Sequence, residues 1–364
     1  MLFEEPSSPG PGQFARTDPL VSWYSRSTRP EAKQSRVIVN GWYAVFPDEG
    51  GRLAARLRSR DNPTHVAALS ELFIHNELKM HHGDVRYEED GRGPDFRIYD
   101  GGSLVGAVEV VTLTEQQDFA AEQGRGDRLI DFVNETVRPT QGFMIGITVL
   151  GQGEVPQGKY SRWLTGVLGQ LNWSLETGPI PPRTFVHQEV AVETNFYRVR
   201  DKDAVAQDPD ALIVGVSSPV GGAVRLEDRL RGSVLDKAGS RYDLASGTAF
   251  TVAAVLRPTF VEDFGVISAL YGSLSVGISQ STEELRRHGN GVFGITQDGA
   301  ALSRRLSSVH VVTGLRPGLE GDAVVSEFMN PYASSEWPGG CLSAHRRFGV
   351  VEADEVNFRM EWIE

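Results

Sequence analysis

Hydrophobic positions recur with helical spacing between residues 62 and 83, where the pattern of the chain is most regular. Asn62 and Pro63 open this stretch, and both favour a helix start, asparagine as a cap and proline at the first helical position. One stripe contains Leu69, Leu72, Phe73, Asn76 and Met80, and a smaller stripe contains Ile74 and Leu78. A helix that is apolar on two sides packs on two sides, so we expect this one inside a core.

Three strand patterns follow the helix. Val85 to Glu88 is short, Phe96 to Tyr99 comes after Gly93-Pro94-Asp95, and Leu104 to Leu113 is rich in valine. Gly101-Gly102 lies between the last two patterns and is a hairpin signal, because glycine adopts the backbone angles of tight turns. The sequence therefore predicts three consecutive strands, with the second and third paired as a hairpin.

A second helix and a fourth strand complete this region. Thr114 and Gln117 have the spacing of a capping box, which opens a helix that runs to about Thr136. Phe143 to Leu150 is a continuous apolar run, typical of a strand buried on both faces. The order helix, three strands, helix, strand predicts an α/β core with a central mixed sheet flanked by helices.

The rest of the chain continues as mixed α/β. Helices are expected near 159–176, 225–238 and 260–271, and strands near 184–199, 211–217, 247–256 and 306–314. We expect three parts: residues 1–35 as a loosely ordered arm, 36–150 as the core with an N-terminal extension, and 151–364 as an α/β extension of unknown role. The extension can belong to the same globule as the core.

Composition adds limits to this picture. The chain has 364 residues, a net charge of −12 and one cysteine, Cys341, which excludes an internal disulfide framework and fits a reducing cytosol. No apolar run approaches a membrane span and the N-terminus lacks a secretory pattern, so we expect a cytoplasmic protein without a membrane partner. The acidic balance disfavours a protein that coats nucleic acid. Arginine clusters at 225–231, 286–287, 304–305 and 346–347 are interpreted singly as solvated faces.

The chemistry of the predicted core depends on carboxylates. Glu109 points the same way along its strand as Ala107 and Val111, and neither face of that strand offers an obvious solvated position. A buried unpaired carboxylate costs several kcal/mol, so Glu109 needs a partner, either a divalent metal or an arginine. Asp95 precedes the neighbouring strand of the predicted hairpin, so both carboxylates can converge on one hard cation such as Mg²⁺.

Further carboxylates lie on the preceding helix. Glu71 shares a stripe with Ile74 and Leu78 and is expected to support the metal, and Glu77 is the competing choice. The alternative for Glu109 is a structural ion pair, with Arg86, Arg97 or Arg128 as the partner. The sequence pattern does not distinguish a metal ligand from a structural ion pair at Glu109.

Pro94-Asp95, thirteen intervening residues and then Glu109-Val110-Val111 resemble the signature of the PD-(D/E)xK, or restriction-endonuclease-like, nuclease superfamily. The wider chain also resembles uncharacterised bacterial proteins with this core, through segments such as GWYAVFPDEGGRLAARLRSRD, GSRYD and FVEDFGVISALYGS. The resemblance implies a hydrolase that cuts phosphodiester bonds with Mg²⁺ or Mn²⁺, in defence or repair. Asp95 and Glu109 would be metal ligands, and Glu71 would complete the catalytic set. Nucleic acid, DNA ahead of RNA, would be the partner, and a homodimer is the assembly to consider.

One position departs from the superfamily pattern. The lysine that normally orients or activates the attacking water should lie two residues after the glutamate, where this chain has Val111. Lys79, Lys237, Gln117 and Gln123 are the candidates to replace it. If none does, the chain is a catalytically inactive binding or scaffold protein of the same fold.

Overall fold

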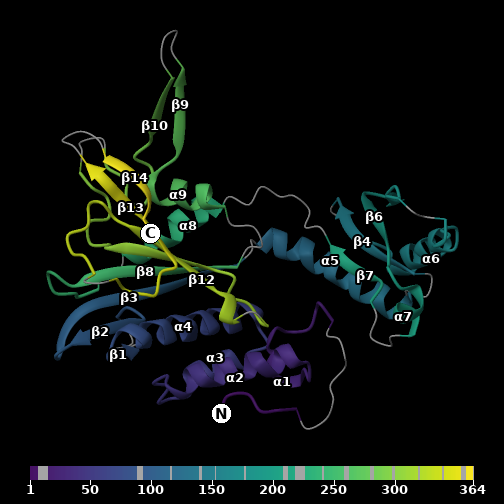
Figure 1. Ribbon diagram of the computed structural model, residues 1–364, viewed down its shortest axis with the longest axis horizontal. Helices are drawn as coiled ribbons and strands as arrows, with labels where there is room; N and C mark the ends of the chain where they lie inside the picture. The colour runs from purple at the N-terminus through teal and green to yellow at the C-terminus, as the bar shows by residue number, and fades with distance from the viewer. Residues whose placement is uncertain are drawn as a thin grey trace. The chain divides into compact units, whose positions relative to one another are not determined.

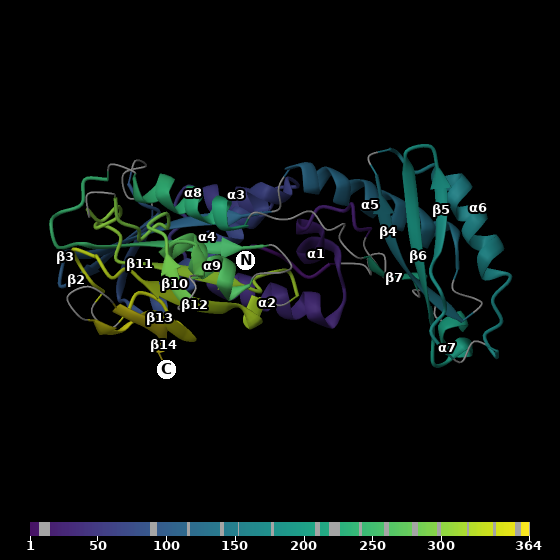
Figure 2. The same cartoon turned by 90° about the horizontal axis from the view of Figure 1, so that it is seen from above.

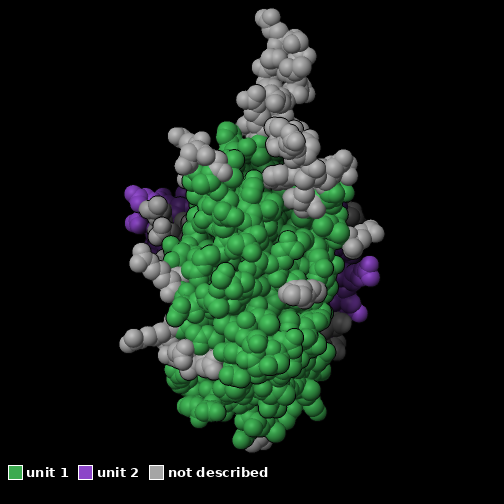
Figure 3. All heavy atoms as spheres, turned by 90° about the vertical axis from the view of Figure 1, so that its left-hand side faces the viewer, with its two compact units in different colours: residues 1–8, 19–114, 225–364 green, residues 9–18, 115–224 purple. Residues whose placement is uncertain are grey.

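The protein is described by a computed structural model that divides into two compact units. It describes residues 1–6, 15–87, 93–114, 117–138, 142–151, 153–175, 178–207, 212–217, 226–239, 242–257, 262–278, 283–296, 300–318, 320–337, 340–353 and 358–363. Unit 1 comprises Met1–Ser8, Pro19–Thr114 and Arg225–Glu364, and unit 2 comprises Pro9–Asp18 and Glu115–Val224 (Figure 3). This division differs from the three parts expected from the sequence, because unit 2 interrupts unit 1 within the chain.

Unit 1 is built on a mixed sheet of eight strands in the order β1-β2-β3-β8-β11-β12-β13-β14. The strands are β1 (Asp84–Tyr87), β2 (Phe96–Asp100), β3 (Ser103–Leu113), β8 (Ala249–Leu256), β11 (Ser308–Thr313), β12 (Val324–Met329), β13 (Arg346–Ala353) and β14 (Phe358–Ile363). β3, β8 and β11 run parallel to one another, and β1 and β2 join as an antiparallel hairpin edge. The three strand patterns before residue 114 are therefore confirmed, with Glu88 outside the described residues.

Helices cover both faces of this sheet. α4 (Asn62–His81) lies on one face, and α8 (Leu226–Ala238) and α9 (Asp263–Tyr271) lie together on the other (Figure 1). The alternation of β3 follows this arrangement: Val108 and Val110 join the core that contains α4, whereas Ala107 and Leu113 join the core that contains α8 and α9. Glu109 has the parity of Ala107 and so belongs to the α8 face.

The N-terminal segment is more ordered than we expected. Helices α1 (Val21–Arg26), α2 (Pro30–Ala44) and α3 (Arg52–Leu57) precede α4, and Tyr24 is fully buried. The buried Arg36 guanidinium donates to the Ser27 carbonyl at 2.8 Å, which ties the first two helices together. The expectation of a loose arm over residues 1–35 is wrong for the described residues, because a six-residue helix is too short to show a periodic pattern.

The expected fourth core strand lies in a different sheet. β4 (Phe143–Leu150) pairs with β6 (Val190–Arg198) and β7 (Val214–Ser217) in the four-stranded sheet β5-β6-β4-β7 of unit 2, with β5 at Arg183–His187 (Figure 2). α5 (Gln117–Thr136) and α6 (Gln157–Leu168) pack on one face of it. The placement of 143–150 beside the first three strands is therefore wrong. An apolar run predicts a buried strand, but it does not specify the sheet that receives it.

Other elements complete the described chain. They are α7 (Lys202–Gln207), the hairpin β9 (Leu274–Ile278) with β10 (Glu283–Arg287), and a 3₁₀ turn at Glu320–Asp322. The helices expected near 225–238 and 260–271 and the strands expected near 247–256 and 306–314 correspond to α8, α9, β8 and β11. In the described part of the chain, no helix combines the length and apolarity needed to cross a membrane.

Candidate functional site

The β2–β3 hairpin places Asp95 and Glu109 opposite each other. Gly101 and Gly102 form its turn with φ angles of 55° and 83°, which glycine adopts without strain. Phe96 pairs with Val108 in the antiparallel register, so Asp95, one residue before the strand, faces Glu109. The hairpin predicted from the sequence therefore forms, and it brings the two predicted metal ligands together.

Backbone hydrogen bonds fix both carboxylates. The Asp95 amide donates to Glu109 Oε2 at 3.2 Å, and the Val110 amide donates to Asp95 Oδ2 at 2.7 Å. Glu109 is only 3% exposed. Each carboxylate therefore accepts a hydrogen bond from the backbone of the other segment of the hairpin, and Glu109 has little contact with solvent.

Lys237 supplies the cationic partner of Glu109. Its ammonium donates to Glu109 Oε1, and it lies in the last turn of α8, on the sheet face to which Glu109 points. Burial opposes the charge on Lys237, but the hydrogen bond that Lys237 donates to Glu109 and the attraction of the Glu109 and Asp95 carboxylates together outweigh it, so the pKa of Lys237 lies above its usual value. The lysine is therefore protonated at neutral pH and provides one positive charge to two carboxylates.

The excess of carboxylates over ammonium groups in this site affects the pKa of Asp95. Burial, followed by repulsion from Glu109, raises the pKa of Asp95 to about 7, against attraction from Lys237 and the Val110 hydrogen bond. Two carboxylates and one ammonium leave a formal charge of −1 in a desolvated site. Such a site favours a proton or another cation at Asp95.

Glu71 lies near this pair but is occupied by other partners. Its carboxylate accepts two hydrogen bonds from Arg56, at 2.8 and 2.6 Å, and one from the Tyr87 hydroxyl at 2.8 Å. Its charge contributes to the raised pKa of Asp95, so the predicted proximity holds. Arg56 and Tyr87 were not identified from the sequence, since neither has a distinctive spacing. Glu77, the competing choice, interacts instead with His345.

Two of the expected arginine partners and one of the lysine candidates lie elsewhere. Arg86 pairs with Asp84 at 3.0 Å, and Arg128 pairs with Glu154 at 3.3 Å. Lys79 donates to the Gly83 carbonyl at 2.6 Å and closes the end of α4. The side chains of the two glutamine candidates, 117 and 123, are outside the described structure. Of the residues expected to replace the missing lysine, Lys237 contacts Glu109.

The donor set suits a hard cation with few protein ligands. Within the described residues, no group of three or more His, Cys, Asp or Glu side chains is arranged to hold a metal ion. Asp95 and Glu109 offer two carboxylates, and Mg²⁺ is commonly held by one or two carboxylates together with water and phosphate oxygens. The residual negative charge and the raised pKa of Asp95 fit such an ion.

The fold and the site define a mixed α/β protein with a buried carboxylate pair and a lysine at its central sheet. No family model, curated protein or solved structure matches this chain. Its function therefore rests on the geometry of the site.

Proposed function

We propose that the chain is a metal-dependent nuclease of the PD-(D/E)xK type, which hydrolyses phosphodiester bonds of nucleic acid, with DNA as the first candidate. The observation that carries this proposal is the contact between Lys237 and Glu109 beside Asp95. The superfamily pattern needs two carboxylates and a lysine at one site, and Lys237 offers the ammonium that Val111 does not.

The arrangement of elements supports the same proposal. α4 is followed by β1, β2 and β3, and after unit 2 the chain continues with α8 and β8. β8 lies next to β3 and parallel to it, with Glu109 opposite Val252. The order helix, three strands, helix, strand is therefore present in unit 1, with α8 and β8 in the places that the sequence assigned to 114–136 and 143–150.

Each side chain has a role in this reaction. Asp95 and Glu109 would hold Mg²⁺ or Mn²⁺, which supplies charge stabilisation at the phosphodiester and acidifies a bound water. Lys237 fixes the rotamer of Glu109 and presents an ammonium at the reacting phosphate. Glu71 acts through its charge on Asp95, as a positioning residue held by Arg56 and Tyr87.

Plasmid degradation with Mg²⁺ or Mn²⁺ tests the proposal. Asp95→Asn should abolish cleavage, because the amide keeps the acceptor for the Val110 amide but loses the charge that binds the cation. Asp100→Asn is the matched control, since Asp100 is exposed at the other end of β2 and should leave cleavage unchanged. Equal cleavage by wild type and Asp95→Asn would exclude this site.

A non-catalytic scaffold of the same fold is the second candidate. It is favoured by the two hydrogen bonds from Arg56 that already satisfy the Glu71 carboxylate. Calorimetric titration of the protein with Mg²⁺ and Mn²⁺ separates the candidates. Binding that disappears in Asp95→Asn supports the nuclease, and absence of binding at millimolar metal supports the scaffold.

A further inference from the structure

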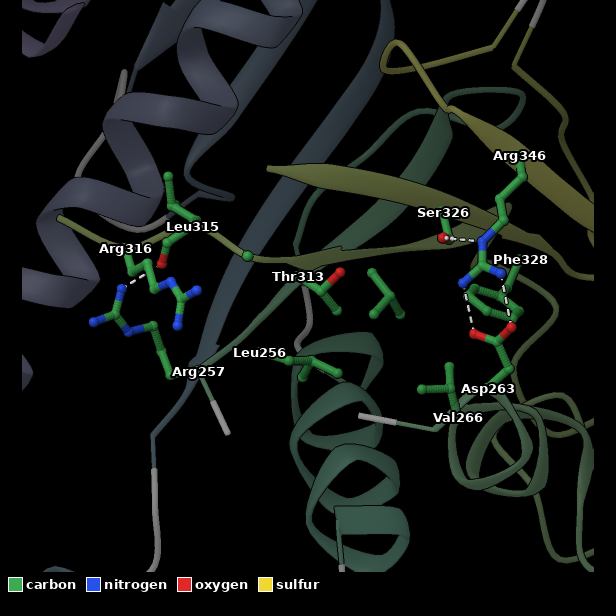
Figure 4. A pocket seen from close by; sticks show the side chains of 12 residues that line it. Leu256, Arg257, Asp263, Val266, Thr313, Leu315, Arg316, Ser326, Phe328 and Arg346 are labelled. Carbon is green, nitrogen blue, oxygen red and sulfur yellow. Dashed lines mark hydrogen bonds and ion pairs between the residues drawn. The ribbon is translucent and has the colours of Figure 1, made fainter. Parts of the chain in front are cut away.

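A cavity of about 460 Å³ lies in unit 1, away from the carboxylate pair. Its walls are formed where β8 and β11 end and where β12 and β13 begin, together with the first turns of α9 (Figure 4). The carboxyl ends of parallel strands are the usual position of ligand sites in open α/β sheets, and the volume is within the range of small-molecule sites.

One end of the cavity is strongly basic. Figure 4 shows the guanidinium groups of Arg257 and Arg316 at the same end of the cavity. Arg257 donates to the Leu315 carbonyl, which fixes its direction. Arg316 is exposed and has no hydrogen bond or ion pair with any residue that the structure describes. The two guanidinium groups together offer several charge-assisted donors to one oxyanion.

The opposite end is polar without net charge. Arg346 forms two hydrogen bonds with Asp263, at 2.7 and 2.5 Å, and one with Ser326 at 3.0 Å. This pairing neutralises Asp263, so its carboxylate does not repel an anion from the cavity. Ser326 and the Arg346–Asp263 pair leave hydrogen-bonding groups facing the space (Figure 4).

Apolar side chains connect the two ends. They are Leu256, Val266, Val311 and Phe328, all buried in the core that contains α8 and α9. A simple inorganic anion uses only the basic end and leaves the rest of the cavity to solvent. A ligand with an anionic group and an uncharged body of nucleoside size uses the whole cavity.

We propose that this cavity binds a phosphate monoester, with the phosphate between Arg257 and Arg316 and its uncharged body on the apolar floor. Bidentate arginine contacts are the geometry that phosphate favours, and the volume of the cavity accommodates the body. The phosphate can belong to a free nucleotide or to the 5′ end of a nucleic acid strand, and these two sources share the same chemistry.

Calorimetry with the full chain tests this site. The probes are adenosine 5′-monophosphate, adenosine, and a tetranucleotide with and without a 5′-phosphate. EDTA in the buffer removes divalent metal, so the result does not depend on metal binding at Asp95 and Glu109. Low salt preserves the electrostatic contacts of exposed side chains. We expect a phosphorylated probe to bind at least about tenfold more tightly than its unphosphorylated partner, which is the effect of one charge-assisted contact.

Two variants assign the binding to the cavity. Arg316→Ala should weaken binding of the phosphorylated probe by about tenfold or more, since it removes one guanidinium. Arg304→Ala is the matched control, an exposed arginine before β11, and should leave affinity unchanged. Tight binding of the monophosphate assigns a free nucleotide, and binding of the phosphorylated tetranucleotide alone assigns a strand end.

Three results would overturn the proposal. They are no binding of either phosphorylated probe at millimolar concentration, equal affinity with and without the phosphate, and equal losses in Arg316→Ala and Arg304→Ala. None of these results depends on whether the protein cleaves nucleic acid.

Discussion

Two glutamates in unit 1 occupy similar positions on apolar strands but have different electrostatic surroundings. Glu109 lies on β3 and is 3% exposed, and Glu327 lies on β12 and is 5% exposed. Glu109 lies between the buried Val108 and Val110, and Glu327 lies between the buried Ser326 and Phe328. Each contacts a cationic side chain from a neighbouring element. Burial of a carboxylate in a strand is therefore not sufficient to mark a functional site.

The difference lies in the balance of charge. Glu327 accepts from the Arg347 guanidinium at 2.8 Å. The nearby His310 is neutral because burial lowers the pKa of that imidazole to about 3. One carboxylate and one guanidinium leave no net charge. Glu109 shares one ammonium with Asp95, so a negative charge remains. An unbalanced carboxylate pair, rather than a buried carboxylate, is the feature that points to cation binding.

The sharpest test of this comparison is the effect of neutralising each glutamate on cleavage. Glu109→Gln should lower metal-dependent cleavage by about a hundredfold or more, because removing a metal ligand costs at least as much as removing one of its supports. Glu327→Gln should keep cleavage within about threefold of wild type, since its pair with Arg347 is structural. Initial rates of plasmid nicking at saturating Mg²⁺ measure both.

Circular dichroism and thermal melting control for unfolding of the two variants. If Glu327→Gln loses as much activity as Glu109→Gln while remaining folded, the balance of charge does not distinguish the two regions.

The pH dependence of stability provides the next test, with an expected effect of about 2 to 4 kcal/mol for a shift of about three pKa units. The folded pKa of Asp95, about 7, exceeds its ordinary value of 3.8. The folded protein therefore holds a proton that the unfolded chain releases between these values, and the free energy of unfolding falls as pH rises from about 4 to 7. Asp95→Asn removes this dependence, because the amide has no charge to bury.

Urea unfolding of wild type and Asp95→Asn at several pH values measures the difference. The variant should be close to wild type near pH 4 and more stable by the full amount above pH 7. Parallel stability curves for the two proteins would contradict the raised pKa of Asp95.

A smaller effect on the cleavage rate is expected from removing Lys237 and from placing a lysine at position 111 of β3 instead. Lys237→Met should lower cleavage by about tenfold and tighten Mg²⁺ binding severalfold, because Glu109 loses its competing cation. Val111 lies two residues after Glu109 on the same face of β3, so Val111→Lys in the Lys237→Met background should restore part of the rate. Cleavage rates and calorimetry of the single and double variants check this. A Lys237→Met protein with unchanged rate and affinity would make the lysine purely structural.

Local elements were predictable from the sequence because their signals are local. The stripe pattern predicted α4, the double glycine predicted the β2–β3 turn, and the valine-rich run predicted β3. The expected cap of α4 was one residue out, because Asp61 rather than Asn62 accepts from the Thr64 amide. The convergence of Asp95 and Glu109 followed from that hairpin, because antiparallel pairing fixes which residues face each other. Lys237 was one of several candidates, and no pattern in the sequence distinguished it from Lys79.

The sequence alone determined the elements between residues 62 and 114, the burial of Glu109 and its pairing with Asp95, since all of these depend on neighbours along the chain. Tertiary structure decided that β8 rather than β4 lies beside β3. It also decided that α8 brings Lys237 to Glu109 across 128 positions of the chain. Both outcomes depend on which apolar surfaces pack together once the chain returns from unit 2 to unit 1. The periodicity of a sequence predicts that a surface is buried, but it does not predict which element covers that surface.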